Sequence, residues 1–377
     1  MEPLGQPASE CSAWISSAAP GTAVERVGRA LTENLRTQGA FRKAYFNKAS
    51  GGLEEQSGEG PLRILARGFT RFGKTIFLFS LKNRLPAFRA CFVDNQNLAF
   101  LAPPHACVFV HDLFYLTHPN SLLERLQGYL QYRGLRGYAK AMVNSEYTRA
   151  CLIEYGMPPD RIHVFPLDFE RGVFYPAAAD DIGLGQRVRA GLGLPERSRF
   201  LFHVSSGEKR KNFGRVMEAF ASLAATHPDL YLVKAGRDLK AGNASRAQAR
   251  ARELGIADRV FFLRAVDDAR LADLYRAADC FVFPSLAEGF GLPVLEAQGC
   301  GCPVVTSNAT ALPEVAGPLC LAVDPWDSEA IAAGISRMLA DTGLRSRVAE
   351  ANRAWVARFS WEPGKRFLED FLAQPRG

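Results

Sequence analysis

The sequence lacks any long apolar run. Its longest uncharged stretches, 95–111 and 297–313, contain Asn, Gln, Gly and Pro, which do not suit a lipid-exposed helix of about 20 apolar residues. The start of the chain has no basic residue before Arg26 and no sustained apolar segment, so it does not resemble a secretory signal. We therefore expect a cytoplasmic protein, at most peripheral on the inner face of the plasma membrane.

Paired metal ligands are also lacking. The eight cysteines are scattered along the chain, at positions 11, 91, 107, 151, 280, 300, 302 and 320. Cys300 and Cys302 form the one close pair, and no second Cys/His pair at ligand spacing accompanies it. The pattern favours buried thiols in a reducing compartment, with no metal site.

Composition excludes disordered and fibrous classes, because 47% apolar and 23% charged residues are close to globular averages. A chain of 377 residues exceeds what one core usually organises, which predicts two domains. The formal net charge is +7, from 46 basic and 39 acidic residues. This excess fits phosphate, anionic lipid or nucleic acid as a partner without selecting among them.

Short runs rich in Val and Phe alternate with helical patterns in the second half of the chain. The runs lie at 199–205, 230–236, 260–266, 280–285, 303–308 and 320–325. Strands buried on both faces and joined by helices predict a doubly wound parallel sheet of the α/β class. Ligands of such sheets bind beyond the carboxyl ends of the strands, so the residues after each run are the candidates for a site.

The first half follows the same scheme less clearly, with a helical pattern at 23–39, a buried strand at 106–110 and helices around a short strand within 121–156. A segment rich in Gly, Ala and Pro at 172–198 is typical of a linker followed by a short helix. We predict a domain at 1–175, a second at 176–357, and a final helix at 358–377 that crosses back to the first.

The most informative segment is EGFGLPVLE, from Glu288 to Glu296. Gly289 and Gly291 permit a tight turn, and Pro293 suits a helix start. The free amides at 289–292 would converge on an anion. The two carboxylates can serve opposite ends of an extended ligand, or they can simply complement the helix N-terminus.

A second segment, EKRKN at 208–212, places three cations just before a helix. This charge opposes the helix dipole unless an anion is present. Arg210 can bind phosphate oxygens in bidentate fashion and Lys211 as a point charge, although a solvated basic turn is an alternative.

The segment FVHDL places His111 and Asp112 at the end of the strand 106–110. His111 can hydrogen-bond a sugar hydroxyl or carry a proton. The alternative is a structural histidine beside a turn-capping aspartate.

Between Glu59 and Asp94 the chain contains no acid, and residues 63–89 carry seven cations with interleaved phenylalanines. One interpretation is a basic-aromatic surface that docks on anionic membrane. The other is a buried strand, IFLFSL, flanked by solvated cations.

The segment 266–317 resembles the donor-binding core of retaining GT-B glycosyltransferases of family 4, the glycosyl transferases group 1. The family signature has a Glu, seven residues and a second Glu, with GFGLP between them. VSSGEKRKN resembles the phosphate-binding segment of the family and FVHDL its His-Asp loop. The likeness covers most of 105–357.

The resemblance implies two Rossmann-like domains that face a central cleft and hold a nucleotide sugar there, without a metal or a resident cofactor. Glu296 would hold the ribose, Arg210 and Lys211 the diphosphate, and Glu288 with the amides of Gly289, Phe290, Gly291 and Leu292 the transferred sugar. The base would pack near Val266, and Gly21 would lie by the donor. Glu288, His111, Arg210 and Lys211 are the candidate catalytic residues.

The expected activity is retaining, metal-independent transfer of a hexose or deoxyhexose, of mannose, glucose or rhamnose type, from a GDP- or UDP-sugar. The acceptor would be a glycan or a lipid-linked glycan in cell-surface polysaccharide synthesis. The alternatives are a GT-B epimerase or hydrolase of nucleotide sugars and, from a different class, a basic nucleic-acid-binding protein. No nucleic-acid-binding motif is present, so we expect no nucleic-acid partner.

Overall fold

The computed structural model divides the chain into two compact units, residues 1–167 with 360–377 and residues 168–359. The structure describes residues 12–16, 23–32, 43–47, 52–56, 62–65, 90–94, 96, 106–119, 121–178, 181, 183–236, 243–264, 266–341 and 343–374. The domain boundaries at 175 and 357 remain predictions. The two compact units meet at residues 167 and 168 and again at 359 and 360.

The second unit contains a six-stranded parallel sheet among its described residues, in the order β11-β10-β9-β12-β13-β14. Its strands are β9 (Arg199–Val204), β10 (Leu230–Ala235), β11 (Val260–Phe262), β12 (Cys280–Phe283), β13 (Val304–Ser307) and β14 (Leu321–Val323). Strands β9, β12 and β13 are buried along nearly their whole length, because helices cover both faces of the sheet.

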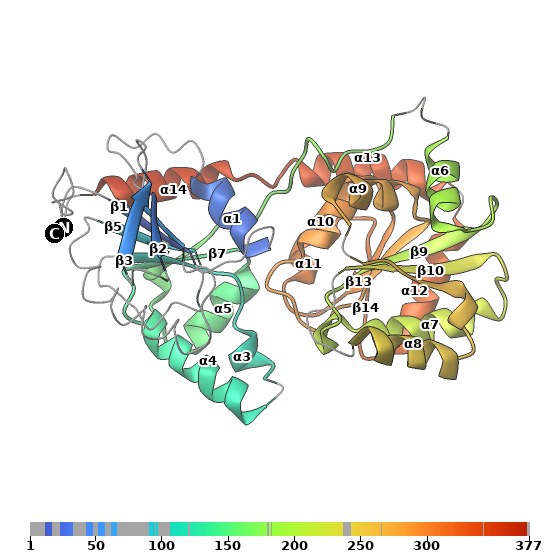
Figure 1. The fold of residues 1–377 in the computed structure, drawn as a ribbon, viewed down its shortest axis with the longest axis horizontal. Helices are drawn as coiled ribbons and strands as arrows, with labels where there is room; N and C mark the ends of the chain where they lie inside the picture. The colour runs from blue at the N-terminus through green and yellow to red at the C-terminus, as the bar shows by residue number, and fades with distance from the viewer. Residues whose placement is uncertain are drawn as a thin grey trace. The chain divides into compact units, whose positions relative to one another are not determined.

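Eight helices of this unit are described, with the 3₁₀ turns η5 (Lys209–Lys211) and η6 (Ala257–Arg259). They are α6 (Leu184–Leu192), α7 (Phe213–Ala224), α8 (Asn243–Glu253), α9 (Asp268–Ala277), α10 (Leu292–Gly299), α11 (Leu312–Val315), α12 (Ser328–Ala340) and α13 (Leu344–Val356). Figure 1 shows α7, α8 and α12 on one side of the sheet and α9, α10 and α13 on the other.

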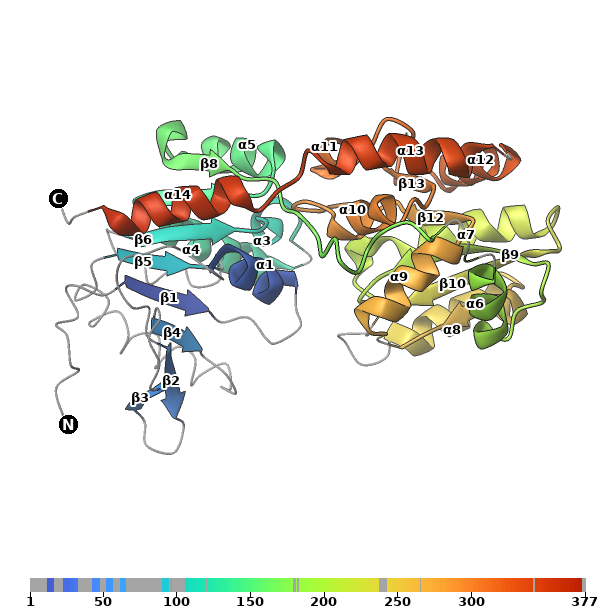
Figure 2. The same cartoon turned by 90° about the horizontal axis from the view of Figure 1, so that it is seen from above.

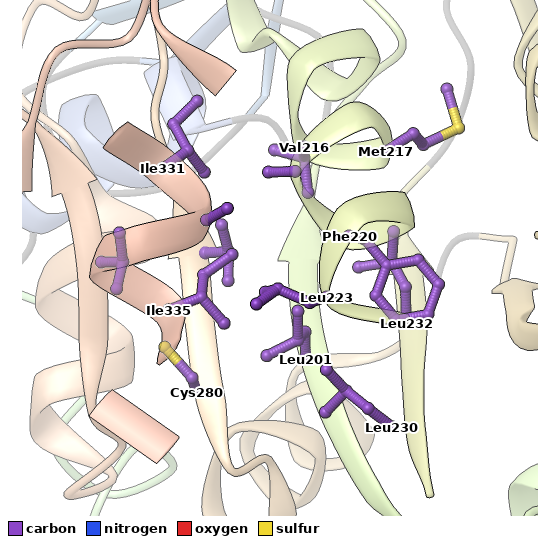
Figure 3. Close-up of a cluster of buried hydrophobic side chains, with 14 of the residues drawn as sticks. Leu201, Val216, Met217, Phe220, Leu223, Leu230, Leu232, Cys280, Ile331 and Ile335 are labelled. Atoms are coloured by element: carbon purple, nitrogen blue, oxygen red, sulfur yellow. The ribbon is translucent and has the colours of Figure 1, made fainter. Parts of the chain in front are cut away.

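The core on the α7 side follows from helical spacing. Phe213, Val216, Met217, Phe220 and Leu223 recur three or four residues apart, which places them on one face of α7. That face packs on Leu201 and Leu232 of the sheet and on Ile331 and Ile335 of α12 (Figure 3). This packing holds the start of α7, and with it the residues just before the helix, at the edge of the sheet.

The strand order creates a switch point between β9 and β12. From β9 the chain moves to β10 and β11 on one side, and from β12 it moves to β13 and β14 on the other. Connections that leave neighbouring strands in opposite directions open a crevice at their carboxyl ends. The residues after β9 and after β12 therefore meet at one place.

In the first unit the described strands form an eight-stranded sheet in the order β3-β2-β4-β1-β5-β6-β7-β8. Only the β2–β3 pair among them is antiparallel. The strands are β1 (Ser12–Ser16), β2 (Lys43–Asn47), β3 (Gly52–Gln56), β4 (Leu62–Leu65), β5 (Ala90–Val93), β6 (Ala106–Val110), β7 (Lys140–Val143) and β8 (Ile162–Val164). The unit thus has the parallel core expected of a Rossmann-like fold, widened by a hairpin at one edge.

Helices cover both faces of this sheet as well. They are α1 (Ala23–Thr32), α3 (Phe114–Thr117), α4 (Leu122–Leu135), α5 (Glu146–Glu154) and α14 (Glu362–Ala373), with the 3₁₀ turn η4 (Pro159–Arg161). The C-terminal helix α14 lies against β5 and α1, so the last described residues belong to the first unit (Figure 2).

The expected fold class, two Rossmann-like units with parallel sheets, is confirmed. No helix within the described ranges combines the length and the apolar character needed to cross a membrane. The seven described cysteines are thiols, and six of them are buried, while Cys11 lies outside the described residues.

Candidate functional site

The loop after β9 is tied to the end of β12 by backbone and side-chain hydrogen bonds. The carbonyl of Arg210 accepts from the backbone N–H of Leu286 at 2.7 Å and from the hydroxyl of Ser285 at 2.8 Å. Asn212, whose φ of 60° lies in the left-handed region, donates from Nδ2 to the carbonyls of Pro284 and Pro325. Asn tolerates this conformation better than most residues. The basic segment is therefore fixed rather than free to swing.

Arg210 and Lys211 form one ionic cluster around the buried Glu288. Lys211 Nζ donates to Glu288 Oε1 at 2.7 Å, and Arg210 Nη1 donates to Glu288 Oε2 at 3.1 Å. Arg210 Nη2 also donates to Glu208 Oε2 at 2.9 Å. Lys211 lies over the ring of Phe283, 4.9 Å from its centroid, which adds a cation–π contact. Residues from the β9 loop and the β12 loop thus meet at the switch point.

Charge within this cluster is balanced. Burial raises the pKa of Glu288, but the charges of Lys211 and Arg210 and the hydrogen bond from Lys211 outweigh it, so the net pKa is lowered. Burial lowers the pKa of Lys211, and Glu288 opposes that effect. The ionised Glu288 therefore holds two cations in place, and Glu208 is the second acid that an incoming anion must compete with.

The start of α10 supplies backbone donors beside the cluster. α10 begins at Leu292, so the N–H groups of Phe290, Gly291 and Leu292 have no intrahelical acceptor. Gly291 has φ 113°, and a Cβ there would lie 2.6 Å from Leu312 Cδ2. The backbone N–H of Glu288 donates to Thr310 Oγ1 at 2.9 Å. A glycine is thus required where the chain turns into the helix, close to Gly289 and Glu288.

Glu296 lies in the second turn of α10 and is 3% exposed. The hydroxyl of Tyr275 donates to its Oε2 at 3.4 Å. Burial, with the charge of Glu296, raises the pKa of Tyr275 well above its usual value, so the phenol stays protonated and keeps this role. Tyr275 packs edge-on against Phe202 and Phe281, which fixes its direction.

His111 lies in the first unit, directly after β6, and is 8% exposed. Its Nε2–H donates to the carbonyl of Asp94 at 2.8 Å, which leaves Nδ1 unprotonated in the neutral ring. Burial lowers its pKa to about 4, against the opposing hydrogen bond to Asp94. Its backbone carbonyl accepts from Asn144 Nδ2. His111 is therefore a neutral acceptor near pH 7.

The other residues singled out from the sequence are not part of the ionic cluster. Val266 is half-buried between β11 and α9. Asp112 accepts from the backbone N–H of Phe114 through Oδ1, which is a turn-capping contact. Gly21 lies outside the described residues. Among the described residues no three His, Cys, Asp or Glu side chains form a group able to hold a metal ion.

Four residues of this site escaped the sequence reasoning. Glu208 and Asn212 were inside the basic segment without a role. Glu208 binds Arg210, two positions away, whereas Asn212 donates to carbonyls 72 and 113 positions away. Tyr275 and Thr310 contact Glu296 and Glu288 from neighbouring segments. For Asn212 the sequence offered one signal, its position directly before a helix.

The strand order defines the class of the second unit, a Rossmann-type unit. Its switch point brings the cation pair and a helix N-terminus together. Residues 186–355 match the family model Glycosyl transferases group 1. The match covers less than half of the chain and lies within the second unit, which is similar to that family over these residues.

Curated relatives carry glycosyltransferase names. A D-inositol 3-phosphate glycosyltransferase from Acidothermus cellulolyticus is 34% identical over 234 residues, which is 59% of this chain and 51% of the relative. The O-antigen chain mannosyltransferase B of Escherichia coli is 50% identical over 101 residues, 27% of this chain and 26% of the relative. The chain spans about half the length of the first of these relatives.

Solved structures match over the whole fold. Anabaena Alr3699/HepE in complex with UDP and glucose aligns with a TM-score of 0.75 and 17% identity, covering 96% of this chain and 99% of that one. WaaG, a glycosyltransferase involved in lipopolysaccharide biosynthesis, aligns with a TM-score of 0.72 and 19% identity over 96% and 99%. At these identities the likeness shows the fold, which is GT-B.

Proposed function

We propose that this protein is a retaining glycosyltransferase that moves a hexose or deoxyhexose from a nucleotide diphosphate sugar to a glycan or lipid-linked glycan. One observation carries the proposal: the cations of Arg210 and Lys211 and the start of α10 converge at the switch point of the sheet. The family match and the relatives' names support transfer. A mannose-type sugar and a role in cell-surface polysaccharide synthesis draw support from the O-antigen mannosyltransferase.

In this proposal each end of the donor has its own residues. Glu296, held by Tyr275, binds the ribose hydroxyls, and the base packs near Val266. The diphosphate takes Arg210 and Lys211 as its partners. A neighbour that was solved with UDP and glucose supports a nucleotide sugar as the ligand of this fold.

Departure of the nucleoside diphosphate is the step that these cations assist. As the bond to the sugar breaks, charge grows on the leaving phosphate oxygen, and preorganised donors stabilise it at low reorganisation cost. Glu288, with the amides of Phe290 to Leu292, orients the transferred sugar. Because the cations already supply positive charge, we propose that the reaction needs no metal.

His111 belongs to the acceptor side of the proposal. With its proton fixed on Nε2, the ring presents Nδ1 as an acceptor for a sugar hydroxyl. Gly21 and residues 63–89, where we propose a basic membrane-docking surface, lie outside the described residues except for β4. Location in the cytoplasm, at the inner face of the plasma membrane, is part of the same proposal.

Donor binding tests the site. In a thermal-shift screen against UDP-, GDP-, ADP- and dTDP-sugars, one nucleotide should raise the melting temperature of the wild type. Glu296→Ala should weaken that nucleotide at least about tenfold, since it removes a charge-assisted hydrogen bond worth about 1.5–3 kcal/mol. Glu329→Gln on the exposed side of α12 is the control. Unchanged affinity in Glu296→Ala would show that the site assignment is wrong.

Turnover tests the reaction class. Nucleotide release should rise when an acceptor extract is added, and the anomeric configuration of the product should match that of the donor. Acceptor-independent conversion to a new nucleotide sugar would support an epimerase instead. Full activity after treatment with EDTA is expected, and a loss restored by Mg²⁺ or Mn²⁺ would contradict the metal-independent step.

A further inference from the structure

Helix α4 carries an apolar face that points away from its own unit. Six of the eight large apolar side chains exposed in the described residues belong to α3 and α4. They are Tyr115, Leu122, Leu123, Leu126, Tyr129 and Leu130. Leu122 and Leu123 are 83% and 78% exposed, so nothing within the unit covers them.

The opposite face of α4 is the one that the fold uses. Gly128 lies so close to α3 that an added Cβ would be 2.6 Å from the backbone of Tyr115. Tyr132 and Leu135 follow Gly128 at helical spacing and are buried. The helix therefore packs through one side, and its exposed leucines are not an extension of the core.

The charges that α4 itself places on its exposed face are of one sign. Arg125 and Arg133 are exposed on α4, and Arg136 follows at its C-cap. Glu124 is the one acid in the helix, and it lies two positions before Leu126, about 160° away around the axis. The face thus combines leucine and tyrosine with arginine, and Glu124 lies on another side of the helix.

We propose that this α4 face, Leu122, Leu123, Leu126, Tyr129 and Leu130 with Arg125 and Arg133, docks the protein on an anionic lipid bilayer. Leucine and tyrosine can enter the headgroup boundary while arginine contacts lipid phosphates, as in helices that lie in the interface. A symmetric contact with a second copy would bring the same arginines together, which disfavours a dimer through this face.

The position of α4 links this surface to the site. α4 is the crossover between β6 and β7, so its N-terminal leucines lie toward the carboxyl edge where His111 follows β6. Docking would bring that edge near the membrane, where a lipid-linked acceptor is held. This last step rests on the proposed function, whereas vesicle binding needs neither donor nor acceptor.

Flotation with vesicles tests the docking surface. The full chain should bind phosphatidylcholine vesicles that contain 30% phosphatidylglycerol, and binding should weaken as salt is raised. The apolar triple variant Leu122→Gln, Leu123→Gln, Leu126→Gln should lose at least about tenfold in partitioning. Arg125→Gln with Arg133→Gln should lose about 30-fold on anionic vesicles, since each arginine near the surface contributes about 1 kcal/mol.

Matched controls come from the second unit. Arg197→Gln with Arg252→Gln removes two exposed charges elsewhere, and Trp326→Gln removes an exposed apolar side chain. Both controls should float like the wild type, and circular dichroism should show that every variant is folded. Gln is a good helix former, so the exposed substitutions leave α4 intact.

Three results would overturn the proposal. The wild type could fail to float with anionic vesicles at low salt, or the triple variant could bind as well as the wild type, which would move docking to another segment such as 63–89. Light scattering could also show a dimer that the triple variant dissociates without any vesicle binding, which would assign the face to a second copy.

Discussion

At the residue scale, Arg210 is shared between two carboxylates in different surroundings. The Glu288 side chain is 8% exposed and also binds Lys211. The Glu208 side chain is 35% exposed and lies in the loop after β9. Exposed ion pairs contribute little to stability, while breaking a buried pair leaves an uncompensated charge. Loss of Glu288 should therefore leave largely buried cations without that partner, whereas loss of Glu208 should remove only a more exposed ion pair.

We predict that Glu288→Gln lowers the free energy of unfolding by about 3 kcal/mol and lowers turnover more than donor affinity. Glu208→Gln should change stability by less than about 1 kcal/mol and should tighten binding of the nucleoside diphosphate, because Arg210 loses a competing anion. Urea unfolding and titration calorimetry measure both effects. Equal stability losses in the two variants would contradict the distinction between them.

At the element scale, the sequence predicts the second unit well and the first unit poorly. β12 reads CFVF, and β9 has the run FLF at its centre, which is typical of strands covered on both faces. β2 and β3 read KAYFN and GLEEQ, and such polar segments form strands here as an antiparallel pair at the sheet edge. The pattern of apolar residues in these two segments is too weak to predict strands.

The site divides in the same way. The glycines and Pro293 predict the start of α10, since they report local backbone needs. The bond between Lys211 and Glu288 joins positions 77 apart, and it depends on which strands become neighbours. The sequence analysis assigned these two residues to different parts of a ligand. The strand order brings their side chains into direct contact with each other.

We predict that Gly291→Ala damages the start of α10. Its φ of 113° is strained for alanine, and the new Cβ would lie 2.6 Å from Leu312 Cδ2, so the Leu312 side chain must move as well. The free energy of unfolding should fall by about 2 kcal/mol, and nucleotide affinity should fall with it. Gly214→Ala is the control, because nothing lies within 4 Å of its added Cβ in α7. Alanine there should stabilise by up to about 1 kcal/mol; a tolerated Gly291→Ala would contradict the proposed turn.

At the scale of the whole molecule, each unit buries a neutral histidine next to the candidate site residues. In the second unit, His203 of β9 donates from Nδ1 to the carbonyl of Val282, and its ring packs on Phe213 and Phe283. Burial lowers its pKa to about 3. In the first unit, burial lowers the pKa of His111 to about 4. Both rings must gain a proton when their unit unfolds in mild acid.

This pairing predicts how acid destabilises the protein. Between the lowered folded pKa values and about 6.5, the unfolded chain binds more protons than the folded one, so stability falls as pH falls through that window. Each histidine should contribute about 1.4 kcal/mol per pH unit between pH 5 and 6. His203→Asn keeps a donor for Val282 but does not titrate, so it should reduce this slope, and His111→Asn should reduce it independently. Urea unfolding by circular dichroism at several pH values measures the slopes. Because the two residues lie in separate compact units, the double variant should lose the sum of the two single effects; a slope in His203→Asn parallel to that of the wild type would show that this histidine is not kept neutral by burial.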